Sequence, residues 1–434
     1  MNSIALTHRK PTPRALTRNA PRLSRGAGFW AVAFSFLVLT AFATAPSALY
    51  GLYAQQEGLS PLTITIVYAV YATGVVVSLV LAGHVSDWYG RRAVLIPALV
   101  LGAVAALLFI VWHSLAGLLV ARVLTGVALG AGVATATAYI ADLDAGPDGT
   151  PSRRSGIVAT IANIGGLAVG PLMAGALAQY APHGLTLPYV LLLAALVVAA
   201  AVVVLSPEGR QPVHPRPAYR LQRLRAPAHA RGQFLAATTA AFLVFAVGGL
   251  FAGLAGTFLA GPLHHPSAVL TGFAIFLNFG AGVLVQTTTT RWPAQRLIAA
   301  GLVPTIVGLI VLVASAWTSP ANLALFLIGG AVTGLGGGAM LRGSLTVVIS
   351  TTGAADRAGA LATYFTAAYV GVSLPVVGLG LALQQLSPRV TLLIFAALVG
   401  AGFLGAAPVV AGTAAVASRA AAVMRHSGAK ATAS

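Results

Sequence analysis

The sequence predicts an all-α membrane protein in which twelve transmembrane helices form two six-helix bundles related by a pseudo-two-fold axis. Three observations lead to this fold class. Hydrophobic residues make up 58% of the chain and its mean hydropathy is +0.90, well above the values typical of soluble domains. Twelve apolar stretches are long enough to cross a hydrocarbon core of about 30 Å as helices. One long hydrophilic segment divides these stretches into six and six.

The twelve apolar stretches are continuous, whereas the strands of a membrane β-barrel alternate in hydrophobicity over about ten residues. Helices are therefore expected, with ends blurred by the Gly and Pro residues that membrane helices tolerate. The predicted spans of the first half are 29–53, 62–83, 93–112, 115–140, 155–178 and 188–205. Those of the second half are 234–261, 268–288, 297–317, 321–349, 359–384 and 390–412.

The segments outside the spans are hydrophilic and basic. Residues 1–28 contain six Lys and Arg residues and no long apolar core, which predicts a cytoplasmic tail and not a cleaved signal peptide. The predicted domains are the tail 1–28, the first bundle 29–205, the central loop 206–232, the second bundle 233–412 and a second cytoplasmic tail, 413–434.

The positive charge is distributed asymmetrically along the chain. The formal net charge is +18, and 22 of the 25 Lys and Arg residues lie in the two tails or in alternate loops. This positive-inside pattern predicts that both termini lie in the cytoplasm. We expect the protein to lie in the cell inner membrane. A nucleic-acid-binding face would not skip every second loop, so we expect no nucleic-acid partner. The chain has no Cys, which excludes disulfides and thiolate chemistry, and we expect no cofactor and no metal site.

The two halves contain a weak internal repeat. Aligning "GHVSDWYGRR" with "GVLVQTTTTR" places Gly83 on Gly282 and Arg92 on Arg291, each pair at the inner end of the second span of its half. Parallel repeats of six helices, with a substrate site between the halves near the middle of the membrane, are typical of transporters. Polar residues are scarce in spans 3, 6, 9 and 12, which predicts that these four face lipid.

The stretch from residue 83 to 92 resembles the loop between helices 2 and 3 of the major facilitator superfamily. That loop has the pattern G-x-x-x-D-x-x-G-R/K-R/K, and the matching residues here are Gly83, Asp87, Gly90, Arg91 and Arg92. The sequence departs from the family where Trp88 replaces a basic residue and Val85 replaces leucine. The resemblance extends over roughly residues 29–412 and implies the twelve-helix fold of that superfamily.

The resemblance also implies that this motif gates transport by holding helix ends together on the cytoplasmic side. Asp87 is expected to meet the start of the eleventh helix near Gly359, where a carboxylate can accept hydrogen bonds from exposed N–H groups. Arg91 is expected to pair with Asp142 at the inner end of the fourth helix. The alternative is that these residues are solvated loop charges beside a tight turn at Gly90.

A second resemblance lies in the fifth span, in "GGLAVGPLMAG". Gly166, Gly170, Pro171 and Gly175 match the G-x-x-x-G-P-x-x-G-G motif of proton-coupled exporters in this superfamily, with Ala174 in place of one glycine. Small residues four apart let helices approach closely, and a proline bends the helix. The alternative is ordinary close packing of a glycine-rich membrane helix.

Two arginines fall inside predicted spans. Arg122, in the outer part of the fourth span, resembles the arginine that is proposed to assist proton transfer in exporters. The alternative is that its side chain snorkels to the outer interface. Arg342, near the inner end of the tenth span, is expected to snorkel inward or to pair with Asp356.

The acidic residues restrict the possible coupling mechanism. All seven lie at predicted helix ends or in loops, and Glu57, just outside the first span, is the nearest candidate for proton uptake. Proton coupling and facilitated diffusion therefore both remain open. Without a buried carboxylate, neutral, amphipathic or anionic substrates fit better than polycations. The candidate lining residues are Tyr68, Tyr71, Asn163, Asn278, Tyr364 and Tyr369, and the alternative for each is that it packs helices together.

The predicted function is secondary active transport of a small organic compound or drug across the lipid bilayer, by proton-coupled efflux and alternating access. The alternative is an importer or uniporter of a metabolite such as a sugar or organic acid, since Pro207 and Glu208 weakly resemble a loop of sugar porters. An enzyme is not expected, because the sequence has no metal cluster, phosphate loop or nucleophile with a base. We expect the protein to act as a monomer.

Overall fold

The computed structural model describes residues 23–82, 85–146, 148–209, 221–222, 224–353, 356–406 and 409, and the regular structure within these ranges is entirely helical. Twelve helices of this described part are long and apolar enough to cross a membrane, which confirms the predicted fold class. Gly83, most of the two predicted tails and part of the central loop lie outside the described residues.

The first six spans are α1 (Arg25–Thr44) with the 3₁₀ turn η1 (Ala45–Ala48), α3 (Pro61–Ala82), α5 (Arg91–Val111), α6 (Leu115–Asp144), α7 (Arg153–Thr160) with η2 (Ile161–Gly165) and α8 (Gly166–Tyr180), and α9 (Leu187–Leu205). Two short helices, α2 (Tyr50–Glu57) and α4 (Val85–Tyr89), follow the first and second spans. The last six spans are α10 (Arg231–Ala260), α11 (Ala268–Thr288), α12 (Ala294–Trp317), α13 (Leu323–Ser350), α14 (Arg357–Ala382) and the span Pro388–Ala406, and a short turn, η3 (Ala228–Ala230), precedes α10.

Several spans begin a few residues earlier than the apolar pattern predicts. The helices α1, α7, α10 and α14 all start at an arginine, namely Arg25, Arg153, Arg231 and Arg357. Arginine is a good helix former, and its long side chain can carry the charge to water while the main chain continues the helix. Hydropathy therefore marks the lipid-embedded part of each helix and not its full length.

The first predicted span, 29–53, is not one continuous α-helix. Its main chain forms α1, then the 3₁₀ turn η1, and then α2. Pro46 lies in the first turn of η1 and has no N–H to donate to the preceding turn of α1. The chain therefore tightens into a 3₁₀ turn. The break precedes Tyr50, which is 5% exposed.

The fifth span is also interrupted, and α1 supplies the missing hydrogen bonds. Pro171 lacks the N–H that would bond the carbonyl of Leu167, and the hydroxyl of Thr44 donates to that carbonyl instead (3.1 Å). The hydroxyl of Thr40 donates to the carbonyl of Ala162 (2.8 Å), in the π-helical turn η2. Side chains of a neighbouring helix thus satisfy backbone groups that lipid cannot.

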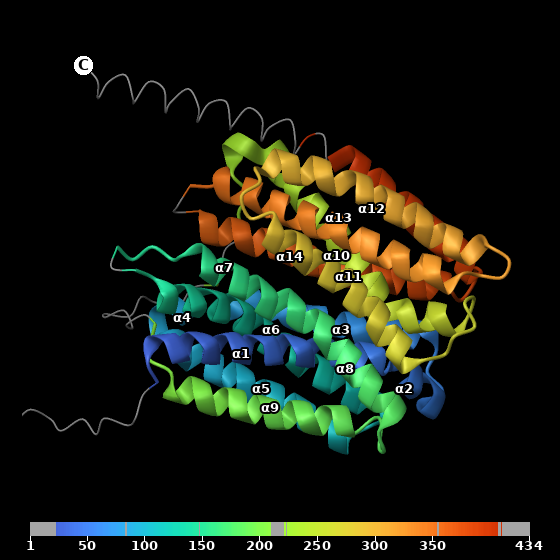
Figure 1. Cartoon of the computed structure of the whole chain (residues 1–434), viewed down its shortest axis with the longest axis horizontal. Helices are drawn as coiled ribbons and strands as arrows, with labels where there is room; N and C mark the ends of the chain where they lie inside the picture. Colours follow the sequence, from blue (N-terminus) through green and yellow to red (C-terminus); the bar gives the residue numbers. More distant parts are fainter. Residues whose placement is uncertain are drawn as a thin grey trace, which may run out of the picture.

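The two halves meet through two pairs of helices. The helix α8 packs against α11, and α3 packs against α14. Figure 1 shows α5 and α9 along one edge of the molecule and α12 along the other. These helices expose large apolar side chains, for example Val104, Val197 and Ile310, which are 44%, 55% and 62% exposed. This agrees with the prediction that spans 3, 6 and 9 face lipid.

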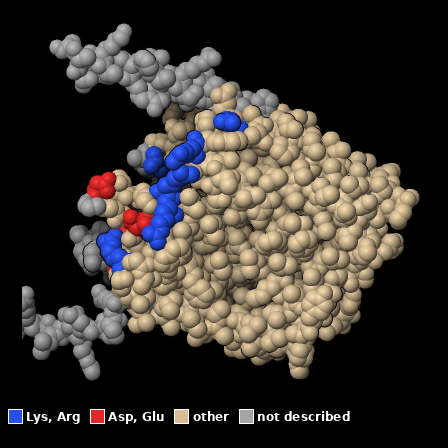
Figure 2. Space-filling model, viewed as in Figure 1, with Lys and Arg blue, Asp and Glu red and all other residues tan. Residues whose placement is uncertain are grey.

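Charged side chains gather at one end of the molecule in the view of Figure 2. We call this end the terminal face; α1 begins there at Arg25, and α4 lies there (Figure 1). We call the other end, which carries α2, the opposite face.

Candidate functional site

The turn between α4 and α5 requires glycine at position 90. Gly90 has a φ of +95°, a conformation that residues with a Cβ avoid. A Cβ at this position would lie 3.2 Å from the carboxyl group of Glu208. Glycine therefore allows α5 to begin directly beside this carboxylate.

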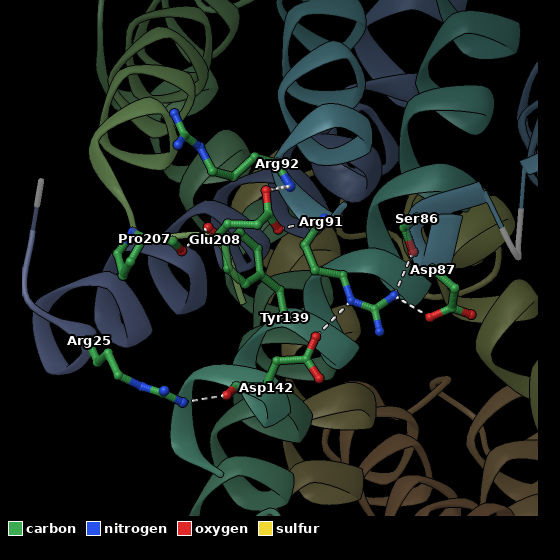
Figure 3. Close-up of polar contacts among 9 residues, drawn as sticks. All are labelled: Arg25, Ser86, Asp87, Arg91, Arg92, Tyr139, Asp142, Pro207 and Glu208. Atoms are coloured by element: carbon green, nitrogen blue, oxygen red, sulfur yellow. Dashed lines mark hydrogen bonds and ion pairs between the residues drawn. The ribbon is translucent and has the colours of Figure 1, made fainter. Parts of the chain in front are cut away.

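Arg91 is the centre of a polar network on the terminal face (Figure 3). The residue is 5% exposed, and its Nε lies 2.8 Å from Oδ2 of Asp142. Its Nη1 lies 2.8 Å from Oδ1 of Asp87 and donates to Oγ of Ser86 (2.8 Å). The predicted pair between Arg91 and Asp142 is thus present. The alternative of a freely solvated loop charge is wrong for Arg91, because its guanidinium is buried and shared between two carboxylates.

Glu208 joins the same network and was not among the predicted site residues. Its carboxylate accepts hydrogen bonds from the backbone N–H groups of Arg91 (2.7 Å) and Arg92 (3.3 Å), at the start of α5. A carboxylate at this position caps the helix and interacts favourably with its dipole. The hydroxyl of Tyr139 donates to the carbonyl of Pro207 (2.6 Å), which holds the segment after α9 against α6.

The Pro207–Glu208 pair was the signal in the sequence that could have identified this cap. Its position directly after the sixth span was evident, but its partner was not, because Arg91 and Glu208 are 117 residues apart in the chain. The side chain of Arg92 donates to the carbonyl of Val204, and the side chain of Arg25 to the carbonyl of Asp142 (2.8 Å). Together these contacts tie α1, α4, α5, α6 and α9 at the terminal face.

Replacing Glu208 with Ala is expected to destabilise the protein by about 1 kcal/mol, because two N–H groups at the start of α5 lose their acceptor. Glu208→Gln should have a smaller effect, since an amide oxygen still accepts but carries no charge for the helix dipole. Thermal unfolding of the purified protein measures both changes. Glu57→Gln, at an exposed position on the opposite face, is the control. An unchanged Tm for Glu208→Ala would contradict the capping role.

The start of α14 is tied to the central loop. The backbone N–H of Arg225 donates to Oγ1 of Thr363 (2.9 Å), which donates to the carbonyl of Arg225 (3.1 Å). The side chain of Arg225 also pairs with Asp356, and the N–H of Gln222 donates to the carbonyl of Val80 in α3 (3.1 Å). The central loop therefore connects the terminal-face end of α3 with that of α14. The expected contact between Asp87 and Gly359 stays a prediction.

Of the two alternatives considered for Arg342, the pair with Asp356 does not form. Its guanidinium donates to the carbonyls of Gln286 and Thr290 (the latter at 3.1 Å), at the end of α11. The carbonyls at a helix C-terminus lack helical donors and attract a positive charge, so they are natural partners for Arg342. The side chain of Arg153 donates to Oγ1 of Thr290 and so connects the two halves at the terminal face.

Arg122 is fully buried and surrounded by tyrosines. Its Nη1 donates to the carbonyl of Ala43 (2.7 Å) and its Nη2 to the hydroxyl of Tyr50. The guanidinium carbon lies 5.4, 5.8 and 5.1 Å from the ring centroids of Tyr50, Tyr68 and Tyr71, within the range of cation–π attraction. Snorkelling to the outer interface, the alternative considered for Arg122, does not occur.

The tyrosines around Arg122 reach the second half of the chain. The ring of Tyr71, in α3, lies 6.4 Å from that of Tyr369, in α14, and Tyr369 lies 5.5 Å from Phe245, in α10. The ring of Tyr68 is 2% exposed and faces Gly253 of α10. We call Arg122, Tyr50, Tyr68, Tyr71 and Tyr369 the arginine cage. It crosses the contact between the halves.

The structure places the other lining candidates in several environments. Asn278, 5% exposed, donates to the carbonyl of Gly330 (3.0 Å) and to Thr333 (3.2 Å), which joins α11 to α13. Tyr364 is fully buried and its hydroxyl shares a hydrogen bond with Ser344 (2.7 Å). These two side chains therefore connect helices of the second half. Asn163 is half-buried in the π-helical turn η2, a feature common at functional sites.

The glycine motif of the fifth span lies where three helices meet. A Cβ on Gly170 would stand 2.1 Å from the carbonyl oxygen of Ala41, and one on Gly166 would stand 2.0 Å from Oγ1 of Thr40, both in α1. A Cβ on Gly175 would stand 2.3 Å from the carbonyl oxygen of Ala268 in α11. The motif is therefore closely packed against both halves of the molecule.

The halves approach each other most closely toward the opposite face. A Cβ on Gly272 of α11 would stand 2.3 Å from the carbonyl oxygen of Pro171, and one on Gly380 of α14 would stand 2.2 Å from Oγ1 of Thr65. Oε1 of Gln179 accepts hydrogen bonds from Oγ of Ser267 (2.6 Å) and from the N–H of Val269 (3.1 Å). These contacts join the two halves near the opposite face.

Twelve apolar helices in two halves, with a buried arginine and its tyrosines at the contact between the halves, define a multi-pass membrane protein. Among the described residues, no three His, Asp or Glu side chains gather in a way that could hold a metal ion. The chain belongs to the major facilitator superfamily, whose family model matches residues 30–324. No curated protein matches the chain in sequence.

Several solved structures of transporters share the fold. The peptide transporter POT in complex with alafosfalin has a TM-score of 0.70 and 13% identity, with 90% of this chain and 95% of that chain covered. The human organic anion transporter MFSD10 (TETRAN) has a TM-score of 0.62 and 15% identity, covering 88% and 99%. The nucleoside transporter NupG has a TM-score of 0.63 and 13% identity, covering 88% and 99%. At these identities the likeness concerns the fold alone.

Proposed function

We propose that this chain exports a small organic compound by alternating access, coupled to proton entry, in the cell inner membrane with the terminal face in the cytoplasm. The observation that carries the proposal is the difference between the two faces. Near the opposite face, α8 packs on α11 and α3 on α14 so closely that Gly272 and Gly380 have no room for a Cβ. At the terminal face, the contacts between halves include a side-chain hydrogen bond from Arg153 to Thr290, which can break without repacking a helix.

Alternating access requires that the halves rock about a site between them. The arginine cage lies at this contact, through Tyr71 and Tyr369. The network around Arg91 ties helices of the first half, so that this half can move as a unit. The resemblance of the glycine motif of α8 to that of proton-coupled exporters supports the exporter assignment.

Transport by the purified protein in proteoliposomes tests the proposal. An imposed pH gradient, acidic on the outside, is expected to drive a cargo compound out of the vesicle interior and to acidify the interior as protons enter. A pH-sensitive dye and a cargo assay measure both fluxes. Cargo movement that is independent of the pH gradient would contradict proton coupling and favour the alternative.

The alternative is a uniporter or importer of a metabolite. It is favoured by the positions of the acidic residues: the structure describes all seven, and each lies at a helix end or in a loop. Net uptake down a concentration gradient, without any pH dependence, would support this alternative. Both functions use the same alternating-access cycle, so the direction of flux under a pH gradient separates them.

A further inference from the structure

The arginine cage holds a positive charge that has no negative partner in the described chain. Arg122 is 0% exposed, and its polar partners are a backbone carbonyl and a tyrosine hydroxyl. The nearest acidic residue in sequence to the cage, Glu57, is exposed at the end of α2, and the other six lie toward the terminal face. A buried charge without a counter-ion is costly, and aromatic rings compensate it only partly.

The cage also has hydrogen-bond donors to spare. Nε of Arg122 is buried without an acceptor. Buried polar groups in proteins are nearly always hydrogen-bonded, so this N–H is an exception that calls for an acceptor. The rings of Tyr68 and Tyr71 lie against the guanidinium, and within the described part of the chain their hydroxyls, which are not fully enclosed, form no hydrogen bond. The cage therefore offers a cation and several donors to an acceptor group that the chain itself does not supply.

We propose that the cage binds the carboxylate of a monovalent organic anion, which is the transported compound. A carboxylate accepts hydrogen bonds through two oxygens and pairs well with a guanidinium. The neighbouring rings of Tyr369 and Phe245 favour an apolar or aromatic body beside that carboxylate. Since Arg122 alone provides the uncompensated charge, a single negative charge on the ligand neutralises the site and a second one does not.

This substrate class rests on the proposed function and deepens it. The outward movement of an anion is favoured by a membrane potential that is negative inside, because charge is transferred across the membrane. The exchange of a monoanion for an entering proton moves two charges in the same sense, so this potential and the pH gradient drive it together. A monoanionic cargo brings its own negative charge to the cage, so no carboxylate in the middle of the membrane is needed to bind it.

The binding test compares acids with their amides, which have nearly the same shape but no charge. The probes are benzoate, octanoate and indole-3-acetate, each paired with its amide, and phthalate as a dianion. The full-length protein in detergent is expected to bind at least one monocarboxylate at least tenfold more tightly than its amide, and more tightly than phthalate. Isothermal titration and the ligand-dependent rise in Tm measure this preference. If no pair shows a preference for the acid, the inference is wrong.

Variants locate the binding site. Arg122→Met is expected to reduce the affinity for the preferred carboxylate to that for its amide, and Arg122→Lys to restore part of it. Tyr71→Phe removes one hydroxyl only, and a loss of affinity of severalfold is expected even if Arg122→Met does not fold. Arg389→Met, which removes an exposed charge at the opposite face, is the control. Unchanged carboxylate affinity in both Arg122→Lys and Tyr71→Phe would overturn the assignment.

Transport assays separate this inference from the proposed function. Efflux of the preferred carboxylate from proteoliposomes is expected to increase severalfold when the interior is made electrically negative. Equal fluxes of acid and amide would overturn the anion assignment and leave the transporter function intact. Carboxylate binding at Arg122 without flux under any gradient would support the site and contradict the proposed function.

Discussion

Cross-linking position 179 to position 267 is expected to abolish transport completely. Oε1 of Gln179 lies 2.6 Å from Oγ of Ser267, and these residues belong to α8 and the start of α11, in different halves of the chain. A covalent link at this place would hold the opposite face closed. Because alternating access requires this contact to open in every cycle, a locked molecule cannot complete transport.

Because the sequence contains no cysteine, the thiol reagent can react only with the cysteines that are introduced. The double variant Gln179→Cys/Ser267→Cys, treated with a short bifunctional thiol reagent, would carry the only two thiols of the protein. Ser60→Cys/Thr63→Cys is the matched control, since Oγ of Ser60 and Oγ1 of Thr63 are 2.9 Å apart on one side of the same half. Transport is measured before and after treatment. Full activity of the cross-linked 179–267 pair would contradict the proposed movement.

Replacing Arg91 with Ala is expected to reduce transport by at least tenfold and to destabilise the protein by about 2 kcal/mol. The loss of a partner from a buried ion pair costs about 3–5 kcal/mol, and the value is lower here because the side chains of Asp87 and Asp142 are 47% and 26% exposed. Without Arg91, both carboxylates would repel each other beside Glu208. The terminal-face ends of α4, α5 and α6 would then separate more easily.

The measurements are thermal unfolding and transport by proteoliposomes with equal protein content. Arg91→Lys should be intermediate, because lysine keeps the charge but cannot contact two carboxylates and Ser86 with a planar fork. The control is Arg296→Ala, an exposed arginine that stacks on Trp292 at 4.0 Å. If Arg91→Ala and Arg296→Ala behaved alike, the network would have no special role in stability or transport.

The corrections to the predicted site have a common cause. Arg342 was expected to snorkel inward or to pair with Asp356; the pair does not form, and the carbonyls of Gln286 and Thr290 are its partners. Asn278 and Tyr364 were candidates either to line a cavity or to pack helices together, and their hydrogen bonds join α11 to α13 and α13 to α14. A polar residue in a membrane helix needs a partner, but its position in the sequence does not say which neighbouring helix presents one at the same depth.

Hydropathy alone was sufficient to identify the twelve spans, because the transfer of a helix into lipid depends on the local composition of about twenty residues. The pair between Arg91 and Asp142 was predicted through the resemblance to the family, and the structure contains it. The helix break at Pro46 was less evident, since a proline in a membrane helix produces a bend, a 3₁₀ turn or no change, depending on its neighbours.

The cap by Glu208 and the cage around Arg122 emerge only when the helices are assembled. Both depend on the rotation and depth of helices that are distant in the chain: α9 against α5 in one case, and α1, α3, α6 and α14 in the other. These variables are decided by close backbone contacts at small residues such as Gly126, where a Cβ would stand 2.0 Å from the carbonyl oxygen of Tyr71. Hydropathy specifies that each helix enters the membrane, whereas packing specifies which side chains face one another once it is there.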